Sequence, residues 1–144
     1  MSLFRSMDAS SSGLTAQRLR MDSISNNIAN VNTTETEDGG PYRRQEPVFK
    51  TRFQEELRRS GVSDSEEKIN GVKVKEIVES NKPPKLEYNP DHPQANEEGY
   101  VEKPNVNIVE EMTNMISATR AYEANVTALD SSKDMYNSAI RIST

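Results

Sequence analysis

The sequence has no cysteine and only one histidine, and both shortages limit its chemistry. Without cysteine, the chain can form neither disulfides nor thiolate metal sites. His92, the single histidine, stands between Asp91 and Pro93, and Pro90 precedes them, a pattern typical of a rigid turn. A single histidine in such a turn is not enough for a Ser-His-Asp triad or for a histidine metal cluster. We therefore expect no catalytic site, no metal and no cofactor.

Hydrophobic residues are also scarce. They make up 33% of the chain, against roughly 45–50% in ordinary soluble domains. Leu, Ile, Val and Phe together account for about 19%, close to the level found in disordered chains of high net charge. The net charge is only −5, so disorder of the whole chain is not predicted. We expect a thin core that needs partners, because ordering each residue's backbone costs about 1–2 kcal/mol.

Basic residues do not predominate, and long apolar runs are missing. The isoelectric point of about 5.0 argues against nucleic acid as a partner. Nowhere do 18 apolar residues run together, so we expect no direct membrane insertion. The first residues, MSLFRSMDASSSG, also lack the continuous apolar stretch of a cleavable signal peptide. Any export from the cytoplasm is therefore expected to use another route.

The N-terminal region carries a helical apolar pattern. Its apolar residues recur at steps of three and four, close to a heptad repeat, apart from Ser10 and Gln17. They are Leu3, Met7, Leu14, Met21, Ile24, Ile28 and Val31. The serines before Gly13 weaken the pattern, because serine prefers caps and a mid-helix glycine costs about 0.8–1.0 kcal/mol relative to alanine. Since Gly39-Gly40-Pro41 signals a turn, we assign residues 1–34 to an N-terminal helical segment.

The middle region, residues 35–103, has shorter and less regular patterns. Residues 42–49 and 72–78 are rich in β-branched or aromatic side chains and predict two strands. Residues 54–68 are strongly charged and predict a solvated loop or a short helix. Residues 81–93 contain four prolines and predict an extended connector without helix or central strand. We interpret this region as a small β-containing domain.

The C-terminal region, residues 104–144, has the clearest pattern. Apolar or aromatic residues fill eight of ten positions spaced by four and three, namely 108, 112, 115, 119, 122, 126, 129, 133, 136 and 140. Asn107 and Glu110 resemble a capping arrangement. About 35 residues at 1.5 Å each give a helix of roughly 50 Å. Such a helix cannot bury its stripe alone, so it needs the N-terminal helix, neighbouring subunits, or both.

The fold class predicted is therefore α+β, with long terminal helices packed as a coiled-coil-like pair. We expect the subunit-packing face to contain Leu14, Met21, Ile24, Ile28, Met112, Met115, Tyr122, Val126 and Leu129. Asn27 and Asn30 belong to a cluster with Asn26 and Asn32. Asparagine both donates and accepts hydrogen bonds, so the cluster suits either helix-end capping or polar contact with a neighbouring subunit.

Three neighbouring carboxylates are candidates for a catalytic pair. Glu35, Glu37 and Asp38 could in principle supply the pair that a glycosidase needs. They lie in a loop rich in threonine and glycine, without the apolar neighbours that raise a carboxyl pKa. A solvated turn is the favoured interpretation.

Several motifs resemble those of the flagellar rod, hook and hook-associated family. Residues 12–19 read SGLTAQRL and residues 26–33 read NNIANVNT, which resembles the family's N-terminal signature. Residues 99–107 read GYVEKPNVN and residues 122–126 read YEANV, similar to the C-terminal half of a rod protein. Further matching residues are Tyr88, Pro90, His92, Pro93, Ala95, Glu111, Met112 and Arg120. The resemblance covers nearly the whole chain.

The resemblance implies a structural subunit of a periplasm-spanning axial rod that transmits motor torque. It implies terminal helices in an inner layer and the middle region in a small outer domain. The implied partners are copies of the chain, other rod and basal-body proteins, and the flagellar type III export apparatus, with no small-molecule substrate. An alternative is a soluble helical adaptor or export chaperone that binds one partner through the same stripes. A wall-cutting glycosidase is a third and more remote alternative.

Overall fold

The chain folds into two long helices and two β-hairpins. The structure is a computed structural model that describes residues 2–53 and 69–142. Its elements are α1 (Ser2–Ala29), β1 (Gln45–Phe53), β2 (Ile69–Glu79), β3 (Lys85–Tyr88), β4 (Tyr100–Lys103) and α2 (Ile108–Ile142). The predicted α+β class, with long terminal helices and a middle region of strands, is confirmed.

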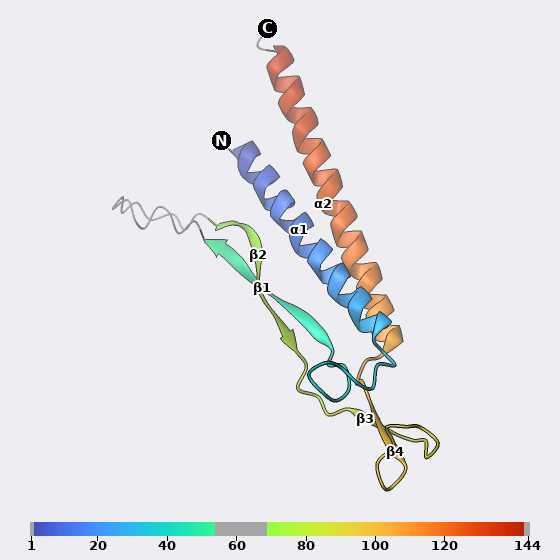
Figure 1. Cartoon of the computed structure of the whole chain (residues 1–144). Helices are drawn as coiled ribbons and strands as arrows, with labels where there is room; N and C mark the ends of the chain where they lie inside the picture. The colour runs from blue at the N-terminus through green and yellow to red at the C-terminus, as the bar shows by residue number, and fades with distance from the viewer. Residues whose placement is uncertain (1, 54–68, 143–144) are drawn as a thin grey trace, which may run out of the picture.

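The two helices run antiparallel along one another, and α2 extends past the N-terminal end of α1 (Figure 1). At 1.5 Å per residue, the 28 residues of α1 span about 42 Å and the 35 residues of α2 about 52 Å. The predicted cap of α2 is present, because the Val109 N–H donates to Asn107 Oδ1 over 3.1 Å. Glu110 and Glu111 lie in the first turn, where the helix dipole favours negative charge.

α1 is continuous through the serine run that lowers its helix propensity. The Ser12 hydroxyl donates to the carbonyl of Ala9 over 2.7 Å, and the Thr15 hydroxyl donates to that of Ser11 over 3.2 Å. The small residues of this run lie where other elements come close to α1. Tertiary contacts therefore override local propensity here.

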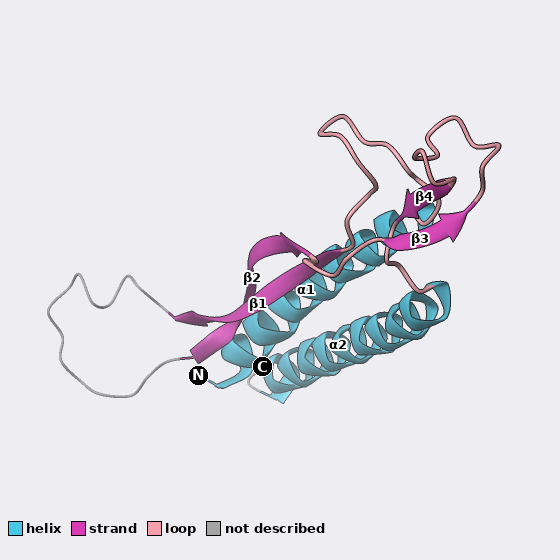
Figure 2. Cartoon of the chain, turned by 90° about the horizontal axis from the view of Figure 1, so that it is seen from below, coloured by secondary structure: helices cyan, strands magenta, loops and turns pink. Residues whose placement is uncertain are grey.

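The first hairpin, β1 with β2, lies lengthwise along α1. The two strands pair antiparallel from Gln45 opposite Glu79 to Phe53 opposite Ile69, with irregularities after Val48 and after Thr51. α1 contacts both strands on one side and α2 on another, so it is the middle layer of three (Figure 2). The hairpin is an extra layer on the helix pair.

The second hairpin, β3 with β4, stands at the end of the molecule where α1 stops and α2 starts (Figure 1). Glu87 and Lys103 form an ion pair of 2.6 Å across it. The Lys85 ammonium donates to the carbonyl of Val106 over 3.3 Å, which ties β3 to the segment leading into α2. This hairpin therefore projects from that end of the helix pair (Figure 1).

The structure corrects the predicted middle region in two respects. β1 and β2 begin or end several residues away from the predicted ranges 42–49 and 72–78. β3 forms inside the predicted connector, between Pro84 and Pro90, and prolines permit this because β3 belongs to a two-stranded sheet in which every strand is an edge. The predicted loop or helix at residues 54–68 lies outside the described residues.

The core is thin, as the composition predicts. Among the described residues, the buried hydrophobic side chains are Ala16, Ile24, Val101, Val106 and Ala118. Two of these five are alanines. Many larger apolar side chains on the helices and hairpins remain exposed.

Candidate assembly interface

The helix pair keeps one register along its length. Ser6 faces Ser132, with hydroxyl oxygens 3.5 Å apart, and near the other end the Asn27 amide bonds Glu111. A Cβ added to Gly13, between these pairs, would lie 3.1 Å from the Asn125 amide. Each step along α1 is matched by an equal step back along α2, and every step is a multiple of seven residues. The seam is therefore an antiparallel heptad pairing.

Small and polar residues occupy the centre of this seam. Its buried members on α1 are Ala16, Ser23, Ile24 and Asn27, and on α2 they are Glu111, Ala118 and Ser132. The Ser23 and Ser132 hydroxyls donate to carbonyls of their own helices, 3.0 and 2.8 Å away. Because these side chains are short, the two backbones approach closely.

The expected packing face lies at the edges of this seam. Ile24 is buried, while Leu14, Met21 and Ile28 on α1 and Met115, Tyr122, Val126 and Leu129 on α2 are half-buried. Met21 and Thr119 bring the two helices together, since the Thr119 hydroxyl lies 3.6 Å from the Met21 sulfur. Met112 points away from the seam and is exposed. The centre of the helix seam on α2 lies at residues 111 and 118, one residue before the stripe positions 112 and 119, and contact of the stripe with neighbouring subunits stays a prediction.

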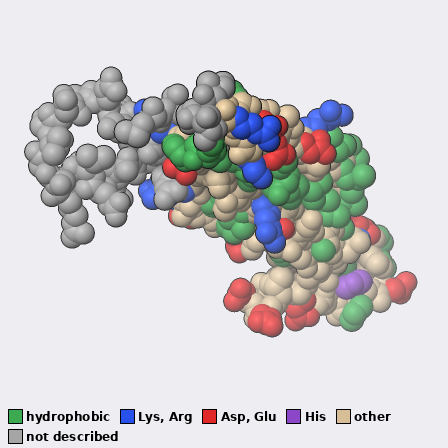
Figure 3. Space-filling view, turned by 90° about the horizontal axis from the view of Figure 1, so that it is seen from above, with side chains coloured by type: hydrophobic (Ala, Val, Ile, Leu, Met, Phe, Trp, Pro, Cys, Tyr) green, Lys and Arg blue, Asp and Glu red, His purple; other side chains and the backbone are tan. Residues whose placement is uncertain are grey.

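Large apolar side chains of α2 are exposed in two groups. Val109, Met112 and Ile116 are 72, 55 and 58% exposed near the start of the helix. Met135, Tyr136 and Ile140 form a second exposed group near its end, and the Phe4 ring packs edge-on against Tyr136 with centroids 5.7 Å apart. We call the first group, Val109, Met112 and Ile116, the outer face of α2. The second group lies beside the seam, at the end where α2 extends past α1 (Figure 1). In the space-filling view, exposed hydrophobic side chains gather in a broad area (Figure 3).

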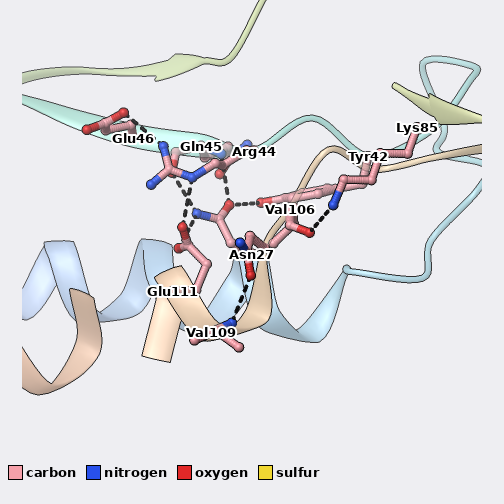
Figure 4. A network of polar contacts seen from close by, with 10 residues as sticks. Asn27, Tyr42, Arg44, Gln45, Glu46, Lys85, Val106, Val109 and Glu111 are labelled. Atoms are coloured by element: carbon pink, nitrogen blue, oxygen red, sulfur yellow. Dashed lines mark hydrogen bonds and ion pairs between the residues drawn. The ribbon is translucent and has the colours of Figure 1, made fainter. Parts of the chain in front are cut away.

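Asn27 is the centre of a buried polar cluster between both helices and the first hairpin (Figure 4). Its side chain is fully buried. The Asn27 Nδ2 donates to the carbonyl of Gln45 over 2.9 Å and to Glu111 Oε2 over 3.0 Å. Its Oδ1 accepts the Gln45 N–H over 2.8 Å and the Tyr42 hydroxyl over 2.9 Å. The amide thus pairs with Gln45 as a neighbouring strand would.

Glu111 brings a negative charge into this cluster. It is 1% exposed, and its Oε1 accepts the Nε–H of Arg44 over 2.8 Å. Arg44 also reaches Glu46 at the surface, 2.9 Å away. A buried carboxylate without such a partner would be strongly destabilising. We call Asn27, Glu111, Arg44 and Tyr42 the Asn27 cluster.

The surroundings of the cluster shift two pKa values. Burial raises the pKa of the Tyr42 hydroxyl, and the charges of Glu79 and Glu111 raise it further. For Arg44, burial acts to lower the pKa, but the hydrogen bonds and charges of Glu111 and Glu46 outweigh it and the pKa is raised. The hydroxyl therefore stays a donor and the guanidinium stays charged.

The other asparagines lie at the end of α1. The Asn30 amide donates to the carbonyl of Asn26 over 2.9 Å, and its Oδ1 accepts the Thr33 hydroxyl over 3.1 Å. Asn30 thus serves the helix end, one of the two predicted roles. Asn27 does not cap the helix end, since its partners lie in the first hairpin and α2, and its side chain is fully buried. Its contact with a neighbouring subunit stays a prediction.

A second contact holds the hairpin to the middle of α1. The Val72 N–H donates to the Ser12 hydroxyl over 3.0 Å. Gly71 beside it has φ +81°, and a Cβ there would lie only 2.0 Å from the Ser12 oxygen. From Ser12 to Asn27 the helix rises about 22 Å, and from Val72 to Glu79, the partner of Gln45, a strand covers about 23 Å. The hairpin and α1 therefore match in length between two anchors.

We predict that Gly71→Ala lowers the free energy of unfolding more than Gly40→Ala does. Both glycines have positive φ, but nothing lies within 4 Å of a Cβ at Gly40. Gly40→Ala is expected to cost the backbone strain alone, about 1–2 kcal/mol. Gly71→Ala adds a clash with Ser12, about 1–3 kcal/mol more. Urea unfolding of both variants measures the difference, and equal costs would show that the close contact does not matter.

The sequence patterns did not indicate five of the contact residues, namely Ser12, Tyr42, Arg44, Gly71 and Glu111. Two signals were present in the sequence. An isolated glycine within a strand, as at Gly71, indicates close approach of another backbone. The heptad-spaced polar and small residues at 111, 118, 125 and 132 mark the face of α2 that lies one position from its apolar stripe.

The sites considered for chemistry are loops at the surface. Glu35 and Glu37 are exposed, and Glu35 accepts a hydrogen bond from the Gln94 amide. The His92 ring nitrogen Nδ1 accepts the Gln94 N–H over 3.2 Å within its turn. Two shallow depressions of about 270 and 310 Å³ lie beside the Gly40–Pro41 turn, and His92 lines neither of them. These groups do not converge as catalytic residues would.

Within residues 2–53 and 69–142, no three His, Cys, Asp or Glu side chains gather as a metal site would require. No helix in the same part of the chain combines the length and the apolar character needed to cross a bilayer.

Comparison with known proteins gives matches at both helical ends and over the full length. The family described as "Flagella basal body rod protein" matches residues 7–35, and "Flagellar basal body rod FlgEFG protein C-terminal" matches residues 97–142. A protein of Borreliella burgdorferi called flagellar basal-body rod protein FlgC is 50% identical over 99% of this chain and 98% of its own length. Its namesake in Bacillus subtilis is 43% identical over 99% of both chains, and that of Escherichia coli is 39% identical over 94% of this chain and 93% of its own. The chain therefore belongs to the FlgC family of flagellar basal-body rod proteins, which are structural proteins and not enzymes.

Proposed function

We propose that this chain is a structural subunit of the flagellar basal-body rod and that it polymerises through the outward faces of its terminal helices. One observation carries the second part of the proposal. The helix pair buries its small and polar residues in its own seam and exposes large apolar residues on the outer face of α2.

An isolated monomer would gain stability from the opposite arrangement. Burying one side chain such as Ile or Met contributes about 1.5–3 kcal/mol relative to exposure. Val109, Met112 and Ile116 are each more than half exposed and follow one another on a helical face. Contiguous exposed apolar surface of this kind marks a protein interface. The isolated subunit therefore exposes apolar surface that assembly would bury.

The partners follow from this assignment. The chain associates with other rod and basal-body components, and copies of itself are the nearest candidates for its outer face. The helical segments 1–34 and 104–144 form the inner, polymerising part, and residues 35–103 form the outer part. Export through the flagellar type III apparatus, without a cleaved signal peptide, and a final position in the periplasmic part of the rod complete the proposal. Torque then passes along the helix contacts.

Purified basal bodies test the proposal against the adaptor or chaperone alternative. The chain is expected to sediment with basal bodies from which soluble and membrane fractions have been removed, and to stay there in the salt concentrations that strip peripheral proteins. An adaptor or chaperone would remain in the soluble fraction. Recovery of the chain only in that fraction would contradict a structural role in the rod.

A further inference from the structure

The centre of the helix seam offers little that fixes its register. Ser6, Gly13, Ala118 and Ser132 are all small, and small side chains tolerate one another in many alignments. A slip of α2 by seven residues, about 10 Å along the axis, would place Ser132 opposite Gly13. That pair would again be small against small. Small pairs of this kind therefore do not fix the register by themselves.

The Asn27 cluster is where a slipped register would fail. The same slip would set Ala118 opposite Asn27 and carry Glu111 about 10 Å away from Arg44. In the observed register, Glu111 accepts from both Asn27 and Arg44, over 3.0 and 2.8 Å. With the Ala118 methyl group in place of Glu111, the fully buried Asn27 amide would lose one of its hydrogen-bond acceptors, and an unsatisfied buried donor is destabilising. A polar side chain buried in a helix seam is known to select one register in coiled coils.

The same residues hold the first hairpin. Asn27 bonds both backbone groups of Gln45, and Arg44 precedes that residue. Arg44 and Asn27 can therefore share Glu111 beneath the docked hairpin only when α1 and α2 are in the observed register. Its far anchor, the bond from the Val72 N–H to Ser12, depends on α1 alone.

We propose that the Asn27 cluster is a register lock that couples the alignment of the two terminal helices to the docking of the first hairpin. This inference concerns the single subunit and does not rest on the proposed function. Its members come from three segments of the chain, and it closes only when all three are in place. The lock aligns the outer face of α2 with the rest of the subunit.

The absence of cysteine makes the register measurable by cross-linking. In the double variant Ser6→Cys with Ser132→Cys, the two introduced thiols replace hydroxyls 3.5 Å apart and should close an intramolecular disulfide. In Ser6→Cys with Ala139→Cys, the thiols meet only after a slip of seven residues. The first pair reports the observed register and the second reports the slipped one. Both are oxidised in dilute full-length chain.

Glu111→Gln is introduced into each reporter, with Glu110→Gln as the matched control. Gln has only one acceptor oxygen, so it cannot accept hydrogen bonds from both Asn27 and Arg44 as Glu111 does. The control removes the same charge from Glu110, which is exposed. With Glu111→Gln, we expect the 6–132 disulfide to form at least tenfold more slowly and the 6–139 disulfide to become detectable. Exchange of the Val72 amide should rise at least tenfold. The control should match the parent in all three measurements.

Tyr42→Phe keeps every charge and removes only the hydroxyl bond to Asn27, so it decides the question if Glu111→Gln does not fold. It should shift the two disulfide rates in the same directions, by about threefold. Unchanged disulfide rates in a folded Glu111→Gln chain would overturn the proposal. So would faster Val72 exchange with an unchanged 6–132 rate, because the cluster would then hold the hairpin without setting the helix register.

Discussion

Replacing Ile116 by aspartate is expected to abolish incorporation of the subunit into basal bodies while leaving the folded monomer intact. Ile116 is 58% exposed on the outer face of α2, so its loss should change the free energy of unfolding by less than about 0.5 kcal/mol. In an assembled rod, the same position would carry an unpaired carboxylate into a dry helix contact. That costs several kcal/mol, in addition to the loss of the about 1.5–3 kcal/mol that burial of Ile116 would contribute.

Ser117→Asp is the matched control for this prediction. Ser117 is the next residue along α2 and is exposed, but it lies about 100° further round the helix, off the line of Val109, Met112 and Ile116. Both substitutions introduce the same charge at neighbouring positions. Swimming in soft agar and the yield of subunit in purified basal bodies measure the outcome. If cells carrying either variant swim equally well, the outer face of α2 is not the contact surface.

The two helices could be predicted because their patterns extend over many turns. Their seam could not be placed with the same accuracy. Apolar periodicity shows where large hydrophobic side chains lie, and in a monomer that face is the buried one. Here Met112 and Ile116 stand on the outside while Glu111 and Ala118 fill the seam. The apolar pattern therefore located the helices and the edges of their seam, but not the small and polar residues at its centre.

The second hairpin was missed for a different reason. β3 has four residues, all of them exposed, and prolines flank it closely. It shows no alternation between buried and exposed positions, which is the signal that reveals a strand in a sequence. Its pairing with β4 depends on residues 12 or more positions away, from Leu86 opposite Glu102 to Tyr88 opposite Tyr100. Local propensity carries no information about such a partner.

The Asn27 cluster shows the same limit for a polar site. The run of asparagines in the sequence near the end of α1 pointed to Asn27. The partners of Asn27, Gln45 and Glu111, are 18 and 84 residues away from it in the sequence. Charged residues such as Glu111 are almost never fully buried unless they are paired. Its pairing with Arg44 becomes visible only when the fold brings three segments together.

Replacing Asn27 by aspartate is expected to lower the free energy of unfolding by about 3–5 kcal/mol at neutral pH, as breaking a buried ion pair does. The substitution keeps the shape of the side chain. It replaces the donor Nδ2 by a negatively charged oxygen, which would face Glu111 Oε2 across 3.0 Å and the Gln45 carbonyl across 2.9 Å. Two attractive contacts become repulsive in a site without water access. Because domains of this size have a total stability of about 5–15 kcal/mol, much of the chain is expected to unfold.

Lowering the pH should partly restore the Asn27→Asp variant, and this separates charge repulsion from a packing defect. The introduced carboxyl and Glu111 can share one proton, so the folded state holds a proton more tightly than the unfolded state, whose carboxyl pKa values are about 3.9–4.3. A group with a raised folded pKa contributes stability below its unfolded pKa and loses it as the pH rises through the folded pKa. The gap between the variant and the parent should therefore narrow from pH 7 towards pH 4.

Asn26→Asp provides the comparison, because Asn26 is the preceding residue and is exposed. It should cost less than about 1 kcal/mol, the usual effect of a negative charge near a helix C-terminus, and the cost should vary little with pH. Urea unfolding followed by circular dichroism at several pH values measures both variants against the parent. Equal costs for the two substitutions at pH 7, or an Asn27→Asp deficit that stays constant down to pH 4, would show that Asn27 and Glu111 do not share a buried site.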